Sequence, residues 1–217
     1  MATHHPALEL LTEYAAGALA VAPAACIAAH LNYCADCRRS VERLQSVGGA
    51  LFETQDPAAV GDGTLNKVLA RLDEAPPLAY AAPTPAEESL PALLQRLMRG
   101  DFSDLRWRSI GDALRITYLP TGDPKREFAL YRIRAGKAIP QHDHRGSEMT
   151  LVLEGGFSDD RGTYHAGDFV HRCGSERHAP RALPDGDCLC LAVLDAPLRF
   201  TGWKFRWINP FLRLHAH

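Results

Sequence analysis

A proline-rich stretch divides the chain into two parts that carry different sequence patterns. Residues 76–91 read PPLAYAAPTPAEESLP and hold five of the 15 prolines, with no periodic apolar positions. Proline fixes its own φ angle and has no N–H to donate, so such a stretch is typical of a semi-extended linker. We therefore expect one domain over residues 1–75, a linker over residues 76–91 and a second domain over residues 92–217.

Apolar residues recur at helical spacing throughout the first part of the chain. Leu8, Leu11 and Ala15 illustrate the pattern, and a proline opens each of the first two segments, where it suits a first helical turn. A unit of about 75 residues buries little apolar surface and often needs a metal ion or a partner for its stability. We expect helices over residues 6–19 and about 23–31, 35–54 and 63–73.

The third and fourth of these segments each place apolar side chains along one face. The residues with this spacing are Val41, Leu44, Val47 and Leu51 in the third and Leu65, Val68, Leu69 and Leu72 in the fourth. Such a stripe packs into the domain's own core or presents a surface to a partner, and both interpretations stay open.

Short apolar segments separated by glycine, proline and aspartate characterise the second part. They read ALRITYL, EFALYRI, EMTLVLEG, GTYHAGDFVH and CLCLAVLD. Evenly spaced short strands with frequent turns are typical of an antiparallel barrel or sandwich. The fold class that we expect is therefore α+β with two domains, an all-α N-terminal domain followed by an antiparallel β-barrel.

One imidazole and two thiols lie close together at the expected junction of the second and third helices. His30 would close the second helix, Cys34 would lie in the turn, and Cys37 would lie in the first turn of the third helix. Mixed nitrogen and sulfur donors favour Zn²⁺, which structural sites hold with four tetrahedral ligands. The spacing therefore predicts a zinc site that fixes the angle between two helices.

The fourth ligand must come from another part of the chain. His5, just before the first helix, is the best candidate, and His4 and Cys26 are the alternatives. A redox pair is another interpretation of the Cys34-x2-Cys37 spacing. A thioredoxin-type pair follows a strand in a βαβ unit, however, and no strand is expected before Cys34.

A second set of metal-ligating side chains lies in the strand-rich part. His142 and His144 alternate along an expected strand, so their side chains point the same way, and a tight turn brings Glu148 to the start of the next strand. His178 is placed to add a fourth ligand from another strand. Two imidazoles and a carboxylate form a divalent-metal site with open coordination positions.

The other histidines and cysteines of this part have plainer interpretations. His165 and His171 are expected to be polar residues at the rim of a hairpin. Cys188 and Cys190 share one face of a strand, and buried cysteine is common, so both are expected to be small core residues.

Composition excludes several classes of protein. A net charge of −2 argues against a nucleic-acid binder that works by bulk electrostatics. The part before residue 85 carries five basic and nine acidic residues, whereas phosphate contacts need basic side chains. No apolar run approaches the ~20 residues of a membrane span, and the N-terminus lacks the basic start of a signal peptide. We expect a cytoplasmic protein without direct contact to nucleic acid or membrane.

The second set of ligands lies in a sequence that resembles a known β-barrel motif. From Gly136 to Gly155 the spacing matches the first motif of the cupins. The second cupin motif is degraded, because residues 173–177 replace the expected Pro-x-Gly and no asparagine follows His178. The resemblance implies a cupin barrel of the jelly-roll type over the second part of the chain.

The first set resembles the ligand motif of the zinc-binding anti-sigma domains, residue by residue at His5, His30, Cys34 and Cys37. Such a domain followed by a cupin is the arrangement of the ChrR-type zinc anti-sigma factors, which this chain resembles over nearly its whole length. The resemblance implies that the helical domain sequesters an extracytoplasmic-function sigma factor. It also implies release under singlet oxygen or related oxidants through the cupin, and zinc in both domains. For the cupin site, iron and manganese stay open as alternatives.

An enzyme is the alternative interpretation from a different class. A metal-dependent cupin dioxygenase or isomerase with an accessory helical domain would use the open positions of the cupin site, with iron for oxygen chemistry. Four protein ligands leave less room for a substrate, and no acid–base partner accompanies them in the motif. We therefore expect a regulator rather than an enzyme.

Overall fold

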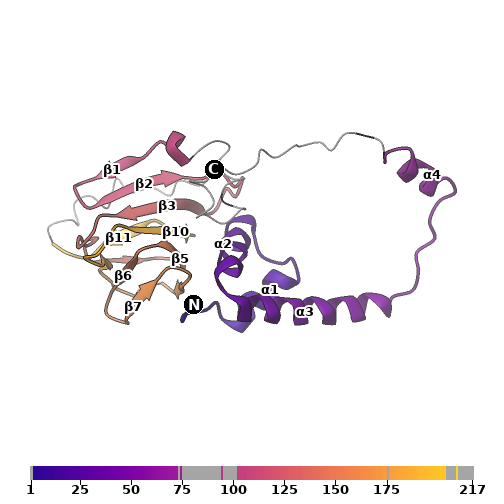
Figure 1. The fold of residues 1–217 in the computed structure, drawn as a ribbon, viewed down its shortest axis with the longest axis horizontal. Helices are drawn as coiled ribbons and strands as arrows, with labels where there is room; N and C mark the ends of the chain where they lie inside the picture. The colour runs from indigo at the N-terminus through magenta and orange to yellow at the C-terminus, as the bar shows by residue number, and fades with distance from the viewer. Residues whose placement is uncertain are drawn as a thin grey trace.

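The structure, a computed structural model, describes residues 2–72, 74, 94, 102–174, 176–203 and 209. Within these residues the first part of the chain is helical and the second part is built from antiparallel strands (Figure 1). The α+β fold class predicted from the sequence is therefore confirmed. The expected linker over residues 76–91 lies outside the described residues.

The helices lie close to the positions that their apolar spacing predicts. They are α1 (Leu8–Ala15), α2 (Val21–Tyr33), α3 (Ala35–Glu53) and α4 (Thr64–Leu69). α1 ends at Ala15 rather than Leu19, because Gly17 takes a left-handed φ of 67° that terminates the helix. None of the described helices has both the length and the hydropathy that crossing a membrane requires.

The second part of the chain forms one large sheet and two small ones. Its elements are η1 (Phe102–Asp104), β1 (Arg108–Ile110), β2 (Leu114–Tyr118), β3 (Glu127–Ile133), β4 (His142–His144), β5 (Glu148–Glu154), β6 (Gly156–Ser158), β7 (Thr163–His165), β8 (Phe169–Arg172), β9 (Arg181–Ala182), β10 (Cys188–Leu194) and β11 (Leu198–Phe200). The large sheet has the strand order β1-β2-β3-β10-β5-β8, and its ladders are antiparallel. β11 pairs with β4, and β6 lies between β7 and β9.

Within the described residues the sheets do not join into a continuous hydrogen-bonded barrel, which differs from the closed barrel expected. Pairing outside the three sheets is reduced to isolated bridges, such as the one between His142 and His178. Side chains of the large sheet and the three-stranded sheet still share one buried cluster, which includes Ile116, Tyr131 and Phe157. The two layers therefore pack face to face, as expected of a jelly roll.

β10 is buried along its whole length because both faces of the large sheet are covered. Cys188 and Cys190 belong to the cluster between the two layers of strands, whereas Leu189 and Leu191 belong to the cluster on the outer face. Cys188 and Cys190 are 0% and 3% exposed. The prediction that they are small core residues is confirmed.

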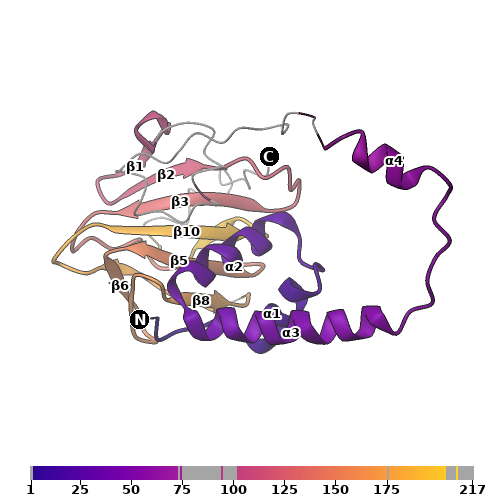
Figure 2. The same cartoon turned by 45° about the vertical axis from the view of Figure 1, so that its right-hand side comes forward.

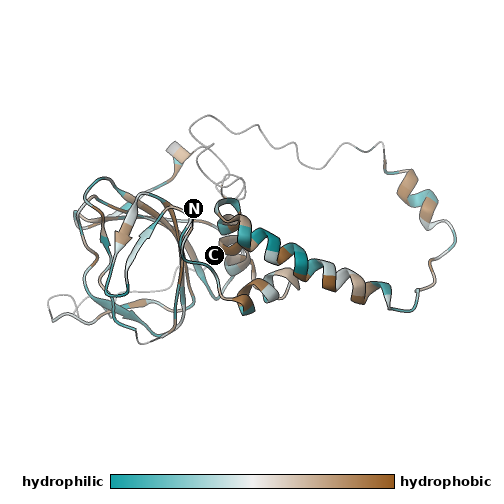
Figure 3. Ribbon diagram, turned by 60° about the horizontal axis from the view of Figure 1, so that its bottom comes forward, coloured by the Kyte–Doolittle hydropathy of each residue, from teal (hydrophilic) through white to brown (hydrophobic). Residues whose placement is uncertain are grey.

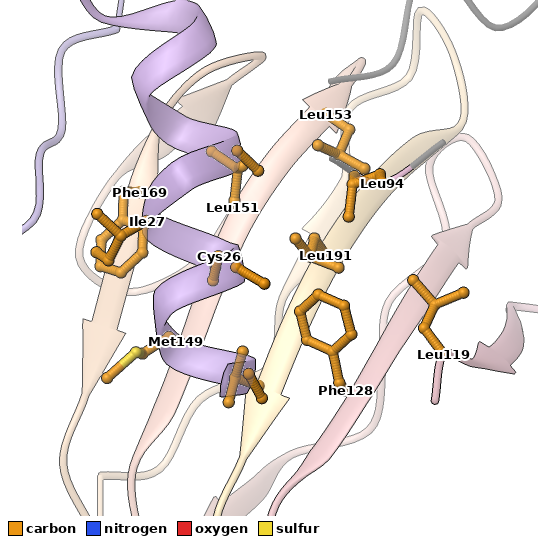
Figure 4. Packing of buried hydrophobic residues seen from close by; sticks show 14 of the residues in the cluster. Cys26, Ile27, Leu94, Leu119, Phe128, Met149, Leu151, Leu153, Phe169 and Leu191 are labelled. Carbon is orange, nitrogen blue, oxygen red and sulfur yellow. The ribbon is translucent and has the colours of Figure 1, made fainter. Parts of the chain in front are cut away.

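The outer face of the large sheet is covered by α2 (Figure 2). Ala25 and Cys26 are small and buried, so the helix approaches the strands closely. Figure 4 shows Cys26 and Ile27 of α2 lying over Leu151 and Phe169 of the sheet. One buried hydrophobic cluster therefore contains side chains from both parts of the chain.

α3 is packed only along its first half. Cys37 and Val41 are buried and the helix runs beside α1, whereas Val47, Leu51 and Phe52 are 60%, 62% and 79% exposed. The apolar side chains of α4 are exposed as well. In Figure 3 the ribbon of α4 carries brown, hydrophobic segments and lies far from the sheet. The apolar stripe predicted on the third helix is therefore core in its first half and exposed surface in its second.

Candidate metal centres

Four side chains predicted to be metal ligands lie together beside α2 and α3. We call His5, His30, Cys34 and Cys37 the helical cluster, and one nitrogen or sulfur atom from each lies within 4.8 Å of the others. The Nδ1 of His5 is 3.3 Å from the Sγ of Cys34 and 3.5 Å from the Sγ of Cys37, and the Nε2 of His30 is 3.3 Å from the Sγ of Cys37. Nitrogen and sulfur ligands of one tetrahedral zinc ion lie about 3.6 Å apart. The cluster therefore has nearly the dimensions of a four-coordinate metal site.

The turn between α2 and α3 places three of these side chains. His30 lies in the last turn of α2, Cys34 caps α3 in an extended conformation, and Cys37 lies in the first turn of α3, which are the positions predicted. The N–H of Cys37 donates to the Sγ of Cys34 at 3.3 Å. The N–H groups and the dipole of a helix N-terminus favour negative charge, so this position suits the thiolates that a metal ion requires.

The imidazole of His30 is oriented to bind through Nε2. Its Nδ1 lies 2.9 Å from the carbonyl oxygen of Gly167, which can only accept, so Nδ1 carries the proton and Nε2 keeps a lone pair beside Cys37. Burial lowers the pKa of His30 to about 4, so the ring is neutral near neutral pH. A neutral ring with its second nitrogen hydrogen-bonded is the usual state of a metal-bound histidine.

The thiol of Cys37 lacks the lowered pKa of a redox-active cysteine. Burial, together with the adjacent Cys34 sulfur, raises the pKa of Cys37 to about 12. Reactive Cys-x2-Cys thiols instead have lowered pKa values, because nearby positive charge stabilises the thiolate. A helix rather than a strand precedes Cys34. The geometry therefore favours a metal ion, whose charge would stabilise both thiolates.

Of the three candidates for the fourth ligand, His5 is the one that lies in the cluster. Cys26 is buried in the core between α2 and the large sheet, where burial raises the pKa of its thiol. The ring of His4 packs edge-on against Tyr164, with centroids 4.7 Å apart. Its Nδ1 is 3.5 Å from a carboxylate oxygen of Asp168. These contacts hold the ring of His4 outside the helical cluster.

Three imidazoles converge in the strand-rich part of the chain. We call His142, His144 and His178 the cupin cluster; all three are buried, and their ring nitrogens lie within 4.8 Å of one another. The Nε2 of His178 is 2.8 Å from that of His142 and 3.3 Å from that of His144. β4 supplies the first two residues, and backbone hydrogen bonds of 3.0 and 2.9 Å hold His178 opposite His142.

The hydrogen bonding of these rings leaves their Nε2 atoms for a cation. The Nδ1 of His142 donates to the carbonyl oxygen of Pro140 at 2.9 Å, so its Nε2 carries a lone pair. The Nδ1 atoms of His144 and His178 are buried and have no hydrogen-bond partner among the described residues. No hydrogen bond at Nδ1 holds these two rings within the described residues, and a shared cation would account for three Nε2 atoms that face one another.

Glu148, the first residue of β5, lies beside the cupin cluster. Its Oε2 is 3.1 Å from the Nε2 of His144 and 3.5 Å from the Nε2 of His178. Burial raises the pKa of Glu148, but the hydrogen bond from His144 and the other nearby imidazoles lower it more, so the carboxyl group is ionised. Three imidazoles and a charged carboxylate form a donor set for a divalent cation.

Some residues that support the clusters carry no signal in the sequence. Asp159 and Arg172 form a buried ion pair behind the cupin cluster, and a carboxylate oxygen of Asp159 is 4.0 Å from the Nδ1 of His178. Neither residue belongs to a motif. The carbonyl oxygen of Gly167, which accepts a hydrogen bond from His30, is a backbone group and cannot be recognised in a sequence. Only the fold brings these groups to the ligands.

Comparison with known proteins identifies the family of this chain. Residues 95–196 match the family described as the ChrR cupin-like domain. The anti-sigma-E factor ChrR of Cereibacter sphaeroides is 39% identical over 214 residues, which cover 97% of this chain and 98% of that protein. This chain belongs to the ChrR family of anti-sigma factors.

A solved structure of a ChrR protein has the same fold. A chain in the crystal structure of Rhodobacter sphaeroides SigE in complex with the anti-sigma ChrR is 38% identical and superposes with a TM-score of 0.76. The match covers 90% of this chain and 100% of that chain. Membership of the ChrR family confirms the resemblance stated from the two motifs, and it confirms that the chain is a regulator rather than an enzyme.

We predict that the helical cluster and the cupin cluster each hold one divalent metal ion. Cys34→Ser should remove the ion from the helical cluster only, and His144→Ala should remove the ion from the cupin cluster only, because each change deletes one ligand. Metal analysis of the purified variants by mass spectrometry measures both losses. His165→Ala is the control, since His165 is exposed and outside both clusters. An unchanged metal content in Cys34→Ser would contradict the assignment of the helical cluster.

Proposed function

We propose that this protein is an anti-sigma factor that binds an extracytoplasmic-function sigma factor and keeps it from RNA polymerase. The helical domain, residues 1–75, holds the sigma factor, and the cupin domain, residues 92–217, releases it under oxidative stress such as singlet oxygen. Residues 76–91 link the two domains. The protein acts in the cytoplasm, without direct contact to nucleic acid or membrane.

Exposed apolar side chains on two helices are the observation that carries this proposal. They belong to the end of α3 and to α4, two segments that lie away from the strands in Figure 1. Apolar surface left open to solvent is typical of a protein–protein interface. The related ChrR protein was crystallised in complex with SigE. The exposed apolar residues are Val47, Leu51 and Phe52 of α3 and Leu65, Val68 and Leu69 of α4.

The charge of the helical part favours a protein partner of opposite charge. Acidic residues outnumber basic residues by nine to five before residue 85. Acidic surfaces repel phosphate groups but attract basic protein surfaces. A sigma factor binds promoter DNA and therefore carries basic surface of the required sign.

We propose zinc as the metal of the helical cluster. Two thiols and two imidazoles are a common donor set of structural zinc sites. The ion joins α2, α3 and the N-terminal segment, so the free energy of metal binding stabilises the shape that binds the partner. Zinc also suits the cupin cluster, where iron and manganese are the alternatives. We assign as ligands His5, His30, Cys34 and Cys37 at the first site and His142, His144, Glu148 and His178 at the second.

Release of the sigma factor begins in this proposal at the cupin cluster. A reaction there acts on the helices only if it changes the relative stability of their partner-binding and free states. The packing of α2 against the large sheet supports such a link, because one buried cluster includes Ile27 of the helix and Leu151 of the sheet. A shift of the strands therefore changes the surface on which the helices rest.

The role of the exposed apolar residues of α3 is tested by the double variant Leu51→Asp and Phe52→Asp. Charges at these positions should weaken the affinity for the sigma factor by at least ~30-fold, because the loss of even one large apolar anchor costs about 2 kcal/mol or more. Calorimetry with the sigma factor that co-purifies with the wild-type chain measures the dissociation constant. Ile110→Asp, at a 49% exposed position on β1, is the matched control and should bind normally. Wild-type affinity in the double variant would contradict the proposed interface.

The role of the cupin cluster is tested with singlet oxygen. The complex of His144→Ala with the sigma factor should persist under illumination with a photosensitiser, because the altered cluster no longer holds its metal ion. Size-exclusion chromatography measures the fraction of complex that remains. The wild type and His165→Ala should both dissociate. Equal dissociation of His144→Ala would exclude the cupin cluster as the sensor.

A further inference from the structure

The N-terminal segment that carries His5 is held by a turn of the cupin part. The carboxylate of Asp168, in the turn between β7 and β8, is 2% exposed. Its Oδ1 accepts the backbone N–H groups of Thr3 at 2.6 Å and His4 at 3.0 Å, as well as the hydroxyl of Thr3 at 3.1 Å. One buried side chain therefore binds successive residues directly before His5.

The same segment makes further contacts with this turn. The carbonyl oxygen of His4 accepts the N–H of Phe169 at 3.0 Å, and the ring of His4 packs against Tyr164. Terminal segments are usually poorly ordered unless they are tied to the fold. His5 follows this anchored segment, and its Nδ1 lies within 3.5 Å of both thiols of the helical cluster.

Gly167, the neighbour of Asp168, orients the other imidazole of the helical cluster. Its carbonyl oxygen accepts the Nδ1–H of His30 at 2.9 Å. A Cβ at position 167 would lie 2.9 Å from the Cβ of Tyr33, and the φ of 95° is unfavourable for other residues, so glycine permits this approach of α2. Two successive residues of the turn thus contact the histidine-bearing segments of the helical cluster. Gly167 accepts a hydrogen bond from His30, and Asp168 binds the residues directly before His5.

We propose that Asp168 is a positioning residue for the helical metal centre, and that the turn between β7 and β8, residues 166–168, completes this centre from the cupin side. Asp168 fixes Thr3 and His4 so that the Nδ1 of His5 faces the two thiolates. This inference rests on the proposed function, since it requires that the helical cluster binds a metal ion. Metal affinity at the cluster is then linked to docking of the helices on the sheet, and docking is equally linked to metal binding.

A purely local role for Asp168 is the competing interpretation. Its Oδ2 also accepts the N–H of His165 at 2.8 Å, which stabilises the turn between β7 and β8 itself. A residue with only this role would affect the stability of the strands and leave the affinity of the helical cluster for metal unchanged. The two interpretations are therefore separated by a signal that arises at the cysteines.

Titration of the metal-free full-length chain with Co²⁺ provides that signal. Thiolate ligands give bound Co²⁺ a charge-transfer absorption that imidazole ligands do not, and its loss in Cys34→Ser assigns it to the helical cluster. Asp168→Asn should weaken this binding about 10- to 100-fold, as observed for residues that orient metal ligands. Asp123→Asn is the matched control, because Asp123 is 7% exposed, accepts the N–H of Lys125 and lies in neither cluster.

Variants of Thr3 test the same contact without changing the cupin part. Thr3→Pro removes the N–H that Asp168 accepts, and it should weaken Co²⁺ binding in the same range. Thr3→Ala keeps that N–H and should weaken binding less. If Asp168→Asn does not fold, the comparison of Thr3→Pro with Thr3→Ala decides.

Co²⁺ affinities of Asp168→Asn and Thr3→Pro equal to those of the wild type and Asp123→Asn would overturn the positioning role while leaving the metal proposal intact. A wild-type chain that binds Co²⁺ without thiolate absorption would overturn both. Weakened binding in Asp168→Asn and Thr3→Pro, with normal binding in Asp123→Asn, supports the inference.

Discussion

The packing of α2 against the large sheet is the contact on which the rest of this structure depends. Cys26 and Ile27 are 0% exposed, and the strands beneath them contribute Leu151 and Phe169 to the same core. Burying a side chain such as isoleucine contributes about 1.5–3 kcal/mol, so the helices and the sheet stabilise each other. Because α2 also carries His30 in its last turn, the packing of this helix on the sheet determines where the helical cluster lies.

One short strand contacts the surroundings of both clusters. At the start of β8, the ring of Phe169 lies 5.9 Å from the ring of His30. At its end, Arg172 pairs in register with Glu148 and forms an ion pair with Asp159 behind the cupin cluster. A change in coordination at the cupin cluster therefore acts on a strand whose other end borders the helical cluster. This arrangement gives a physical basis for the proposed regulator, which carries a cluster of candidate metal ligands in each part of the chain.

The sequence predicts the local elements and the ligands far better than the contacts between them. The sequence predicts β3 over Glu127–Ile133 as observed, because a short apolar run bounded by turn residues defines a buried strand locally. The sequence predicts that His30, Cys34 and Cys37 lie together, because the short turn between α2 and α3 leaves few ways to arrange them. The packing of α2 on the large sheet could not be predicted from the sequence, because a helix that is apolar on most sides does not specify which surface it packs against. The anchoring by Asp168 could not be predicted either, because its partners are backbone groups of residues distant in sequence.

Hydrogen–deuterium exchange of the full-length chain tests most directly whether helices and strands share one core. Amides of α2 should exchange as slowly as those of β10, because both elements open only when the common core opens. α4, whose apolar side chains are exposed, should exchange fast and serves as the internal reference. Exchange of α2 at the rate of α4, with β10 still protected, would contradict the account.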